Sequence, residues 1–406
     1  MPRLRDAASD VASQVTVQWR SVVLPTLVLW GLATVVSNTL LHPFDVGEYA
    51  QYAHAALRAP LLHRFPLEYP APALVVFVLP LLLGFSYPWA FSLLVGVVLL
   101  ALVLAFTRAG ITGWDERAVG RLIIYLALGE IMVLSGRYDL FASAAALMAL
   151  RAARRDHWAA AWTWSGVGFA LKLFPAALWP VFLIAEWRRS GRFALRRLWW
   201  VAGSIAVIAG VPALFDHHAA VTALRYYLNR PTEDGGLAAG LSVVFDPGGT
   251  QWINSFHSVN VVSAITAPLA VAIEVGAVLE CLWVWWCQAR GKLSMTAASL
   301  ATITFVMLGS KVLSVQYLMW LMPFWALYRL RVSWLLAAAA NLAVFPYVVT
   351  ATQFGYIPTR PFVISLTLAF LARDVLIAVG TAAWLRSELR ASHPGTARWR
   401  EHATQG

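Results

Sequence analysis

The sequence has few charged residues and lacks the motifs that bind nucleotides. Only 13% of the 406 residues are charged and 60% are hydrophobic, whereas soluble domains contain about 25% charged residues. This balance excludes an ordinary soluble protein. The sequence contains neither GxxxxGK[ST] nor a strand-bound GxGxxG, which argues against chemistry driven by ATP within the chain. The histidines at 217, 218 and 257 do not have a metal-ligand spacing such as HExxH, so we expect no metal site.

Cysteine is also scarce. Cys281 and Cys287 lie six residues apart within one apolar stretch. On a helix this spacing places them on different faces, so we expect no disulfide. The polar N-terminal segment precedes an apolar run without a convincing signal-peptidase site, so we expect a retained first helix.

Basic residues are abundant, and their positions predict a membrane topology. The formal net charge is +11, and 22 of the 31 Lys and Arg residues fall in clusters that share one side of a membrane if successive helices alternate. A basic excess on one side is typical of cytoplasmic loops, so we expect both termini to be cytoplasmic and no nucleic-acid partner. The clusters are Arg3, Arg5 and Arg20; Arg108, Arg117 and Arg121; Arg151, Arg154 and Arg155; Arg188, Arg189, Arg192, Arg196 and Arg197; Arg290 and Lys292; Arg329 and Arg331; and Arg386, Arg390, Arg398 and Arg400.

Long apolar runs predict an all-α, multi-pass membrane bundle of about twelve transmembrane helices, forming one domain over residues 1–406. A hydrocarbon core about 30 Å thick needs roughly 20 apolar residues per helix. The polar segments 42–70 and 216–261 fall on the extracytoplasmic side and are expected to form the active-site face. We expect helices near 21–41, 71–106 (interrupted between Gly84 and Pro88), 118–136, 138–153, 158–171, 174–187, 197–215, 262–288, 294–309, 312–328, 333–350 and 362–385.

Nine basic residues lie outside the clusters, and four of them suggest a binding site. Arg137, Lys172, Arg230 and Lys311 come from separate parts of the chain, yet all are predicted on the extracytoplasmic side. A shared anionic ligand such as a phosphate would explain them together. Alternatively, each side chain extends to the interface or pairs with a nearby acid.

Acidic residues in the same segments are candidate catalytic groups. Asp45 follows the first helix and is a candidate general base. The sequence alone slightly favours a role as the cap of a helix over 46–57, and the two roles are compatible. Glu48, one helical turn later, is the alternative base. Asp139 is a candidate ion-pair partner of Arg137, and Asp374 is expected to neutralise its neighbour Arg373 within a helix.

Six segments together resemble glycosyltransferase family 87, whose members have the GT-C fold and include actinobacterial mannosyltransferases. The segments are DVGEYAQYAHAAL (45–57), EYPAPAL (68–74), SGRYDLFASAAALMAL (135–150), GVGFALKLFPAALWPVFLI (166–184), YYLNRPTEDGGLAAGL (226–241) and SKVLSVQYLMWLMP (310–323). Each is loose alone, but their order and shared side make the resemblance specific.

The resemblance implies a membrane enzyme that transfers a sugar, mannose above all, from a polyprenyl-phosphate donor to a lipid or glycan acceptor. Asp45 matches the family's loop acid and would be the base of an inverting displacement. No further cofactor is implied. Glu233 and Asp234 depart from the family's Glu-Ser pair, which puts their role as ligands in doubt. The implied substrate-binding residues are Arg137, Asp139, Lys172, Arg230, Lys311, Gln316, Tyr317, Glu68 and Tyr69.

Two other classes of membrane protein remain as alternatives. A transporter or lipid flippase also places charges within the membrane, but the chain shows no repeated half. A non-catalytic scaffold does not explain why acids, histidines and aromatic residues concentrate in residues 42–70.

Overall fold

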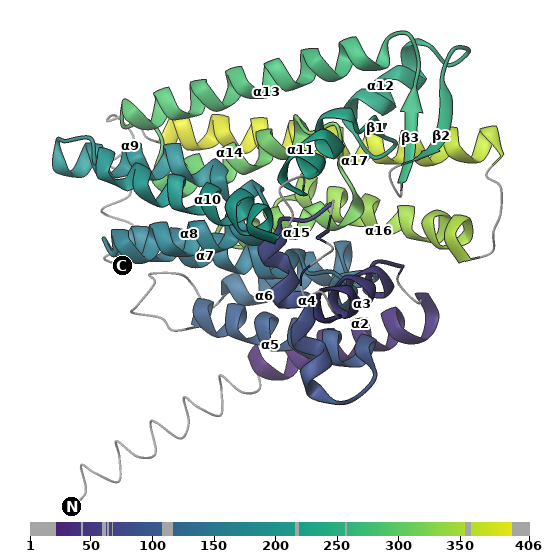
Figure 1. The fold of residues 1–406 in the computed structure, drawn as a ribbon. Coiled ribbons are helices and arrows are strands. Elements are labelled where there is room, and N and C mark those ends of the chain that lie inside the picture. The colour runs from purple at the N-terminus through teal and green to yellow at the C-terminus, as the bar shows by residue number, and fades with distance from the viewer. Residues whose placement is uncertain are drawn as a thin grey trace, which may run out of the picture.

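The computed structural model shows a predominantly helical protein, 79% helical, as the sequence predicts (Figure 1). It describes residues 22–41, 44–58, 62, 65–66, 68–107, 117–215, 219–255, 258–353 and 359–391. The chain ends that the sequence places in the cytoplasm lie largely outside these ranges.

The first half of the described chain consists of nine helices. They are α2 (Leu24–Val35, continued by a π-helix over Val36–Leu41), α3 (Phe44–Leu57), α4 (Leu74–Val78), α5 (Tyr87–Thr107), α6 (Arg117–Gly129), α7 (Asp139–Arg154), α8 (Trp158–Leu171), α9 (Leu178–Ser190) and α10 (Leu198–Phe215). Short 3-10 turns cover Ala71–Ala73, Leu79–Leu83, Leu134–Gly136, Phe174–Ala177, Leu195–Arg197 and Val315–Tyr317.

The segment 42–70 is more ordered than a polar loop because it contains α3. This helix begins at Phe44, so Asp45 lies in its first turn and not at the cap position before it. An acid in the first turn still interacts favourably with the helix dipole. The predicted helix over 46–57 is therefore confirmed. Asp45 does not cap it but interacts with its dipole from within the first turn.

The apolar stretch 71–106 is interrupted as expected. Gly84 ends the 3-10 turn after α4 with a left-handed φ of 73°, a conformation that glycine adopts without strain. The ring of Phe77 in α4 stacks on Tyr49 of α3, with centroids 4.4 Å apart, and the Tyr87 hydroxyl donates to the Phe77 carbonyl at 2.9 Å. The chain thus stays near α3 until α5 begins.

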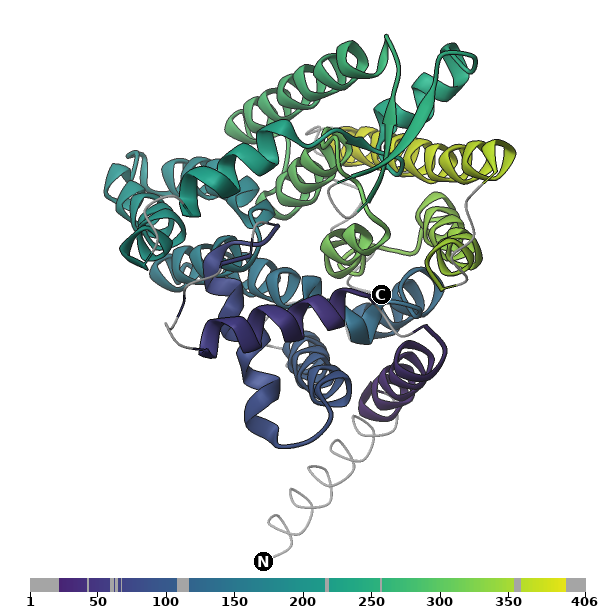
Figure 2. The ribbon, with the colours of Figure 1, turned by 45° about the vertical axis from the view of Figure 1, so that its right-hand side comes forward.

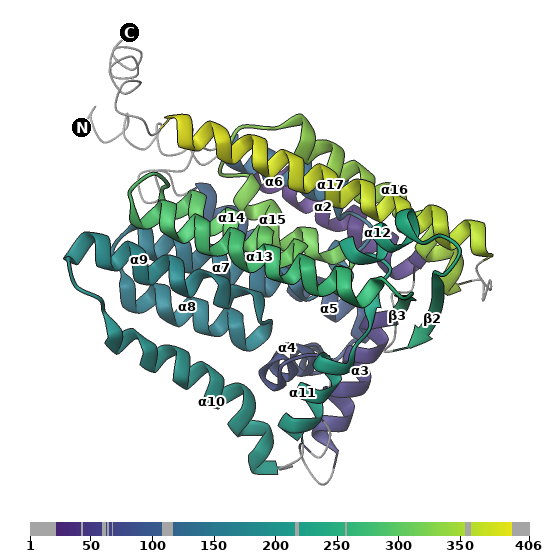
Figure 3. The same cartoon turned by 90° about the horizontal axis from the view of Figure 1, so that it is seen from above.

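The second half adds five long or apolar helices and a region of mixed structure. The helices are α13 (Thr266–Ala289), α14 (Met295–Leu308), α15 (Leu318–Trp325), α16 (Val332–Gln353) and α17 (Arg360–Ala391). In Figure 3, α13 to α17 lie together on one side of the bundle, while α10 runs along the edge.

The segment 216–261 folds into helices and strands, which corrects the all-α prediction. It contains α11 (Ala219–Asn229), β1 (Thr232–Glu233), α12 (Leu237–Phe245), β2 (Gln251–Ser255) and β3 (Ser258–Val262). The strands form an antiparallel sheet in the order β1-β3-β2, with Glu233 opposite Asn260 and Ile253 opposite Asn260. The sheet stands beside α17 (Figure 2), where the Trp252 indole donates to Thr367 at 3.2 Å.

Four helices in the described ranges are long and apolar enough to cross a membrane, namely those covering 87–106, 195–215, 266–289 and 360–391. The predicted total of about twelve spans is not confirmed. The side chains of α10 are largely exposed, with Trp199 at 79% and Leu214 at 83%. Such an apolar exposed face suits contact with lipid.

Described residues from several of the predicted basic clusters lie at one end of the bundle, which we call the basic end. There Arg331 of α16 donates to Ser387 of α17 at 3.0 Å, and Arg121 of α6 donates to the Ala326 carbonyl after α15 at 2.8 Å. Arg189 of α9 pairs with Asp156.

Candidate active site

Lys172 and Asp139 form the centre of a polar cluster at the opposite end of the bundle, which we call the site end. Asp139 begins α7 and Lys172 directly follows α8, so the hairpin between these helices brings them together. The Lys172 ammonium donates to Asp139 Oδ1 at 2.5 Å, and the Trp320 indole donates to the same oxygen at 2.7 Å. Asp139 is 1% exposed, and a buried carboxylate needs such partners.

Aromatic rings surround the Lys172 ammonium. Its nitrogen lies 5.1 Å from the Tyr138 ring centroid, 4.8 Å from Tyr317 and 5.3 Å from Trp320. Tyr317 stacks on Trp320, with centroids 4.0 Å apart. Cation–π contacts of this kind hold an ammonium in place in a site that excludes water. Two of the predicted substrate-binding residues, Lys172 and Tyr317, are therefore in contact.

Asp45 pairs with Arg137, so the expected pairing of Arg137 with Asp139 is wrong. Both side chains of the observed pair are mostly covered, with 14% of Asp45 and 20% of Arg137 exposed. The pair joins the first turn of α3 to the turn before α7. Glu48, the alternative base, lies one turn along α3 and is buried.

Glu233, whose role the sequence left in doubt, lies at the site end with Arg230. Its two carboxylate oxygens each accept the Ser314 hydroxyl at 2.8 Å, and the Arg230 guanidinium lies 3.8 Å away. Arg230 also donates to Ser258 at 3.3 Å. No local signal reveals this arrangement, because Ser314 lies 81 residues further along the chain.

Asp234 lies beside Glu233 but contributes little charge. Burial, reinforced by the Glu233 charge, raises the pKa of Asp234 to about 8. The carboxyl is therefore mostly protonated at neutral pH. Glu233 is consequently the acid of this pair that balances Arg230.

Glu68 and Tyr69 join the site end through aromatic neighbours. The Tyr226 hydroxyl of α11 donates to Glu68 at 2.6 Å. Tyr69 packs edge-on against Tyr49 and Tyr138, with centroids 5.6 and 5.2 Å away. These contacts connect the segment before α4 to Tyr138, one of the aromatic rings around the Lys172 ammonium.

Three of the four predicted cations lie close together, and the fourth lies nearer the surface. Lys172 is near enough to Arg137 and Arg230 to be repelled by both. The Lys311 ammonium instead donates to the Leu228 carbonyl at 3.1 Å, at the exposed edge of α11. Arg137, Lys172 and Arg230 could therefore bind a phosphate together.

Gln316 is a buried residue with an unsatisfied polar atom. It is 8% exposed, and its Oε1 atom has no hydrogen-bond partner among the residues the structure describes. A buried carbonyl oxygen without a partner is costly. The hydroxyl of a bound sugar would satisfy it.

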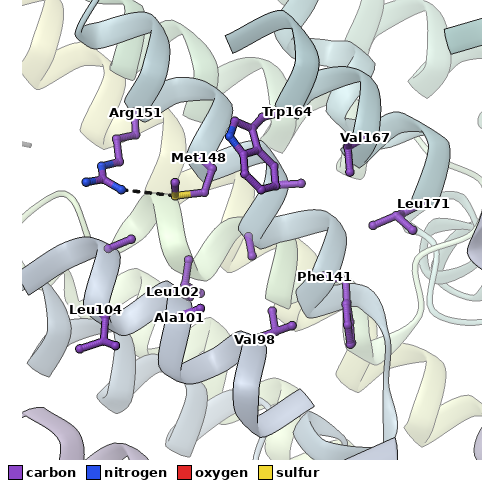
Figure 4. Close-up of a pocket in the computed structure, with 13 residues that line it drawn as sticks. Val98, Ala101, Leu102, Leu104, Phe141, Met148, Arg151, Trp164, Val167 and Leu171 are labelled. Carbon is purple, nitrogen blue, oxygen red and sulfur yellow. Dashed lines mark hydrogen bonds between the residues drawn. The ribbon is translucent and has the colours of Figure 1, made fainter. Parts of the chain in front are cut away.

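An apolar groove of about 530 Å³ lies between α5, α7 and α8 (Figure 4). One end of the groove is lined by Leu171, which precedes Lys172, and by Phe141, two residues after Asp139, while Lys172 and Asp139 themselves do not line it. Arg151 lines its other end. Leu104, Trp164 and Val167 at the margin are about 40% exposed, so the groove opens to the bundle surface.

No group of three potential metal ligands assembles in the part of the chain that the structure describes. Both cysteines are free and buried. The histidines at 217, 218 and 257 lie outside the described residues.

Comparison with known proteins identifies the family. The family model for glycosyltransferase family 87 matches residues 67–310, more than half of the chain. Among curated proteins, none matches the chain. The matched range contains Arg137, Asp139, Lys172 and Arg230, and the match favours an enzyme over the transporter or flippase considered above. The chain therefore belongs to glycosyltransferase family 87.

Proposed function

We propose that this glycosyltransferase transfers mannose from a polyprenyl-phosphate donor to a lipid or glycan hydroxyl at the extracytoplasmic face of a membrane. The observation that carries the proposal is the junction of two different environments. A cluster of Arg137, Lys172 and Arg230 lies where the hairpin between α7 and α8 begins and ends, and an apolar groove runs between these two helices and α5. A lipid-linked sugar phosphate has the same division, with an anionic head next to an apolar chain.

The chemistry proposed for the cluster is a single displacement at the anomeric carbon. The acceptor oxygen forms a bond to this carbon while the bond from the carbon to the phosphate oxygen breaks, and the electron pair leaves with the polyprenyl phosphate. Asp45 takes the proton of the acceptor hydroxyl, with Glu48 as the alternative base. Attack opposite the leaving group inverts the anomeric configuration.

The cations would stabilise the transition state more than the ground state. The donor is a phosphodiester with one negative charge, and the leaving phosphomonoester carries a second. Fixed positive charges in a covered site act most strongly on charge that develops during the reaction. Because Arg137 contacts Asp45, the same guanidinium would hold the base close to the phosphate.

The remaining predicted residues are suited to contact the sugar or to hold the surrounding side chains and helices in place. Gln316 offers an unpartnered oxygen to a sugar hydroxyl, and Tyr69 and Tyr317 offer aromatic faces next to the cations. Asp139 holds Lys172 in place, and Glu68 anchors α11 through Tyr226. Lys311 lies at the rim, where an arriving head group would pass.

The groove predicts a dependence on the chain length of the donor. Replacing Ala144 by Phe fills part of the groove, and we expect a higher KM for a donor with a long isoprenoid chain, since the chain loses apolar contact area. A donor with a short chain should be affected much less. Steady-state kinetics with both donors measure the difference.

A matched control for this variant is available on α8. Ala160 is exposed and does not line the groove, so Ala160→Phe should leave both KM values unchanged. Equal effects of Ala144→Phe on the long and short donors would remove the groove from chain binding.

Mass spectrometry tests the function in cells. A strain lacking the gene should accumulate a lipid or glycan that is one hexose lighter than its normal product. Reintroducing the wild-type gene should restore the product, and an unchanged lipid and glycan profile in the deletion strain would contradict the proposal.

A further inference from the structure

Arg373, in the middle of α17, is fully buried and makes four hydrogen bonds. Its Nε donates to Asp374 at 2.9 Å, Nη1 donates to the Asn341 side chain at 3.0 Å, and Nη2 donates to the carbonyls of Gly235 and Leu313 at 3.0 and 3.1 Å. The Arg373 residue is 0% exposed. Burying a charge this completely is costly unless the partners repay it.

Neutralising Asp374 does not explain the other bonds. Neutralising the Asp374 carboxylate needs a single contact, which a lysine would also make. The two carbonyl acceptors instead belong to the turn after β1 and the turn after α14, which are 78 residues apart in sequence. The planar guanidinium is suited to hold several acceptors in a fixed geometry.

Asn341 of α16 extends the same connection. Its amide accepts from Arg373 and donates to the Val315 carbonyl at 3.1 Å and to the Gly129 carbonyl at 2.9 Å. The turn after α14 is therefore held at Leu313 and again at Val315. Both bonds fall within the residues that lead to Gln316 and Tyr317.

The two turns are also in direct contact with each other. The Glu233 amide donates to the Lys311 carbonyl at 2.9 Å, and Ser314 donates to the Glu233 carboxylate. A Cβ atom at Gly235 would collide with the Leu313 carbonyl oxygen. The close approach thus requires glycine at 235, and Arg373 bonds the two carbonyls that meet there.

We infer that Arg373 is a positioning residue that fixes the spacing between the Arg230–Glu233 turn and the Gln316–Tyr317 turn, and so the fit of the donor head group. The inference rests on the proposed function, which assigns these two turns to the binding of the donor. Arg373 itself does not touch the cluster around Lys172, since its hydrogen bonds go to the turns behind it.

The first test measures the turn geometry and does not require a substrate. Val312 is partly exposed on the second turn, and both native cysteines are buried, so Val312→Cys provides a thiol whose alkylation rate reports local opening. In this background Arg373→Lys keeps a charge beside Asp374 but cannot hold all four acceptors. We expect faster alkylation than in the Val312→Cys parent.

The second test measures kinetics. Arg373→Lys and Gly235→Ala should each raise KM for polyprenyl-phosphate mannose roughly tenfold to a hundredfold, as expected when binding groups move by about 1 Å. KM for the acceptor should change little, while the melting temperature should fall, because Arg373→Lys leaves buried acceptors without a donor and Gly235→Ala crowds the Leu313 carbonyl oxygen. Arg121→Lys, another arginine bonded to a carbonyl between helices, and Gly248→Ala, where a Cβ meets open space, should match the wild type.

The outcomes separate this inference from the proposed function. Wild-type protein that fails to use the donor refutes the proposed function, while the alkylation rates still decide whether Arg373 holds the turns. Unchanged alkylation in Arg373→Lys overturns the inference. Equal losses of donor and acceptor affinity overturn it as well, because they indicate a purely structural role.

Discussion

Replacing Asp45 by Asn is expected to abolish sugar transfer while the protein still accumulates in the membrane. A general base contributes roughly 10²- to 10⁴-fold to the rate, so kcat should fall by about this factor. Asparagine has nearly the same shape as aspartate but cannot take up the proton of the acceptor's hydroxyl group. Transfer from a radiolabelled polyprenyl-phosphate mannose donor, normalised to protein abundance, measures the effect.

Two further variants make the Asp45 result specific. Asp156→Asn removes an acid that pairs with Arg189 at the basic end, so it should leave transfer unchanged. Glu48→Gln tests the alternative base. Full activity in Asp45→Asn combined with loss in Glu48→Gln would move the role of base from Asp45 to Glu48.

Replacing Lys172 by Met is expected to have the second largest effect. Lys172 is the cation at the centre of the cluster, and losing one group that stabilises developing negative charge costs about 10²- to 10³-fold in kcat. The change also leaves the buried Asp139 carboxylate with the Trp320 indole as its remaining partner, which should lower stability. Both kcat and protein abundance should therefore be measured.

A double variant separates these two causes. Lys172→Met combined with Asp139→Asn removes both charges, so the protein should accumulate normally and still fail to transfer sugar. Arg360→Met is the matched control, because Arg360 bonds the Pro247 and Gly248 carbonyls at an exposed position. Recovery of transfer in the double variant would mean that Lys172 serves only to neutralise Asp139.

Much of the helical framework was predictable because apolar runs end at charged or glycine-containing turns. The predicted helix 158–171 coincides with α8, and the predicted interruption near Gly84 is present. Membership of glycosyltransferase family 87 was predictable from six short segments, and the family match confirms it.

The pairing of Asp374 with its neighbour Arg373 was predicted, but the sheet and the ion pairs of the candidate site were not, because they depend on residues distant in the sequence. Strand β1 pairs with β3 across α12, and the short strands carry little local signal. Asp139 pairs with Lys172, 33 residues away, although Arg137 is its nearer neighbour in sequence. Burial decided this choice, since the α7–α8 hairpin and Trp320 enclose Asp139. The number of transmembrane helices was equally hard to predict, because the length of an apolar run does not show whether a short helix crosses the bilayer.

The most direct test of the account is the donor requirement of the purified wild-type protein. Reconstituted in lipid with an acceptor fraction from membranes, it should transfer labelled mannose from polyprenyl-phosphate mannose and should not use GDP-mannose. Transfer from GDP-mannose with no transfer from the lipid-linked donor would contradict the account.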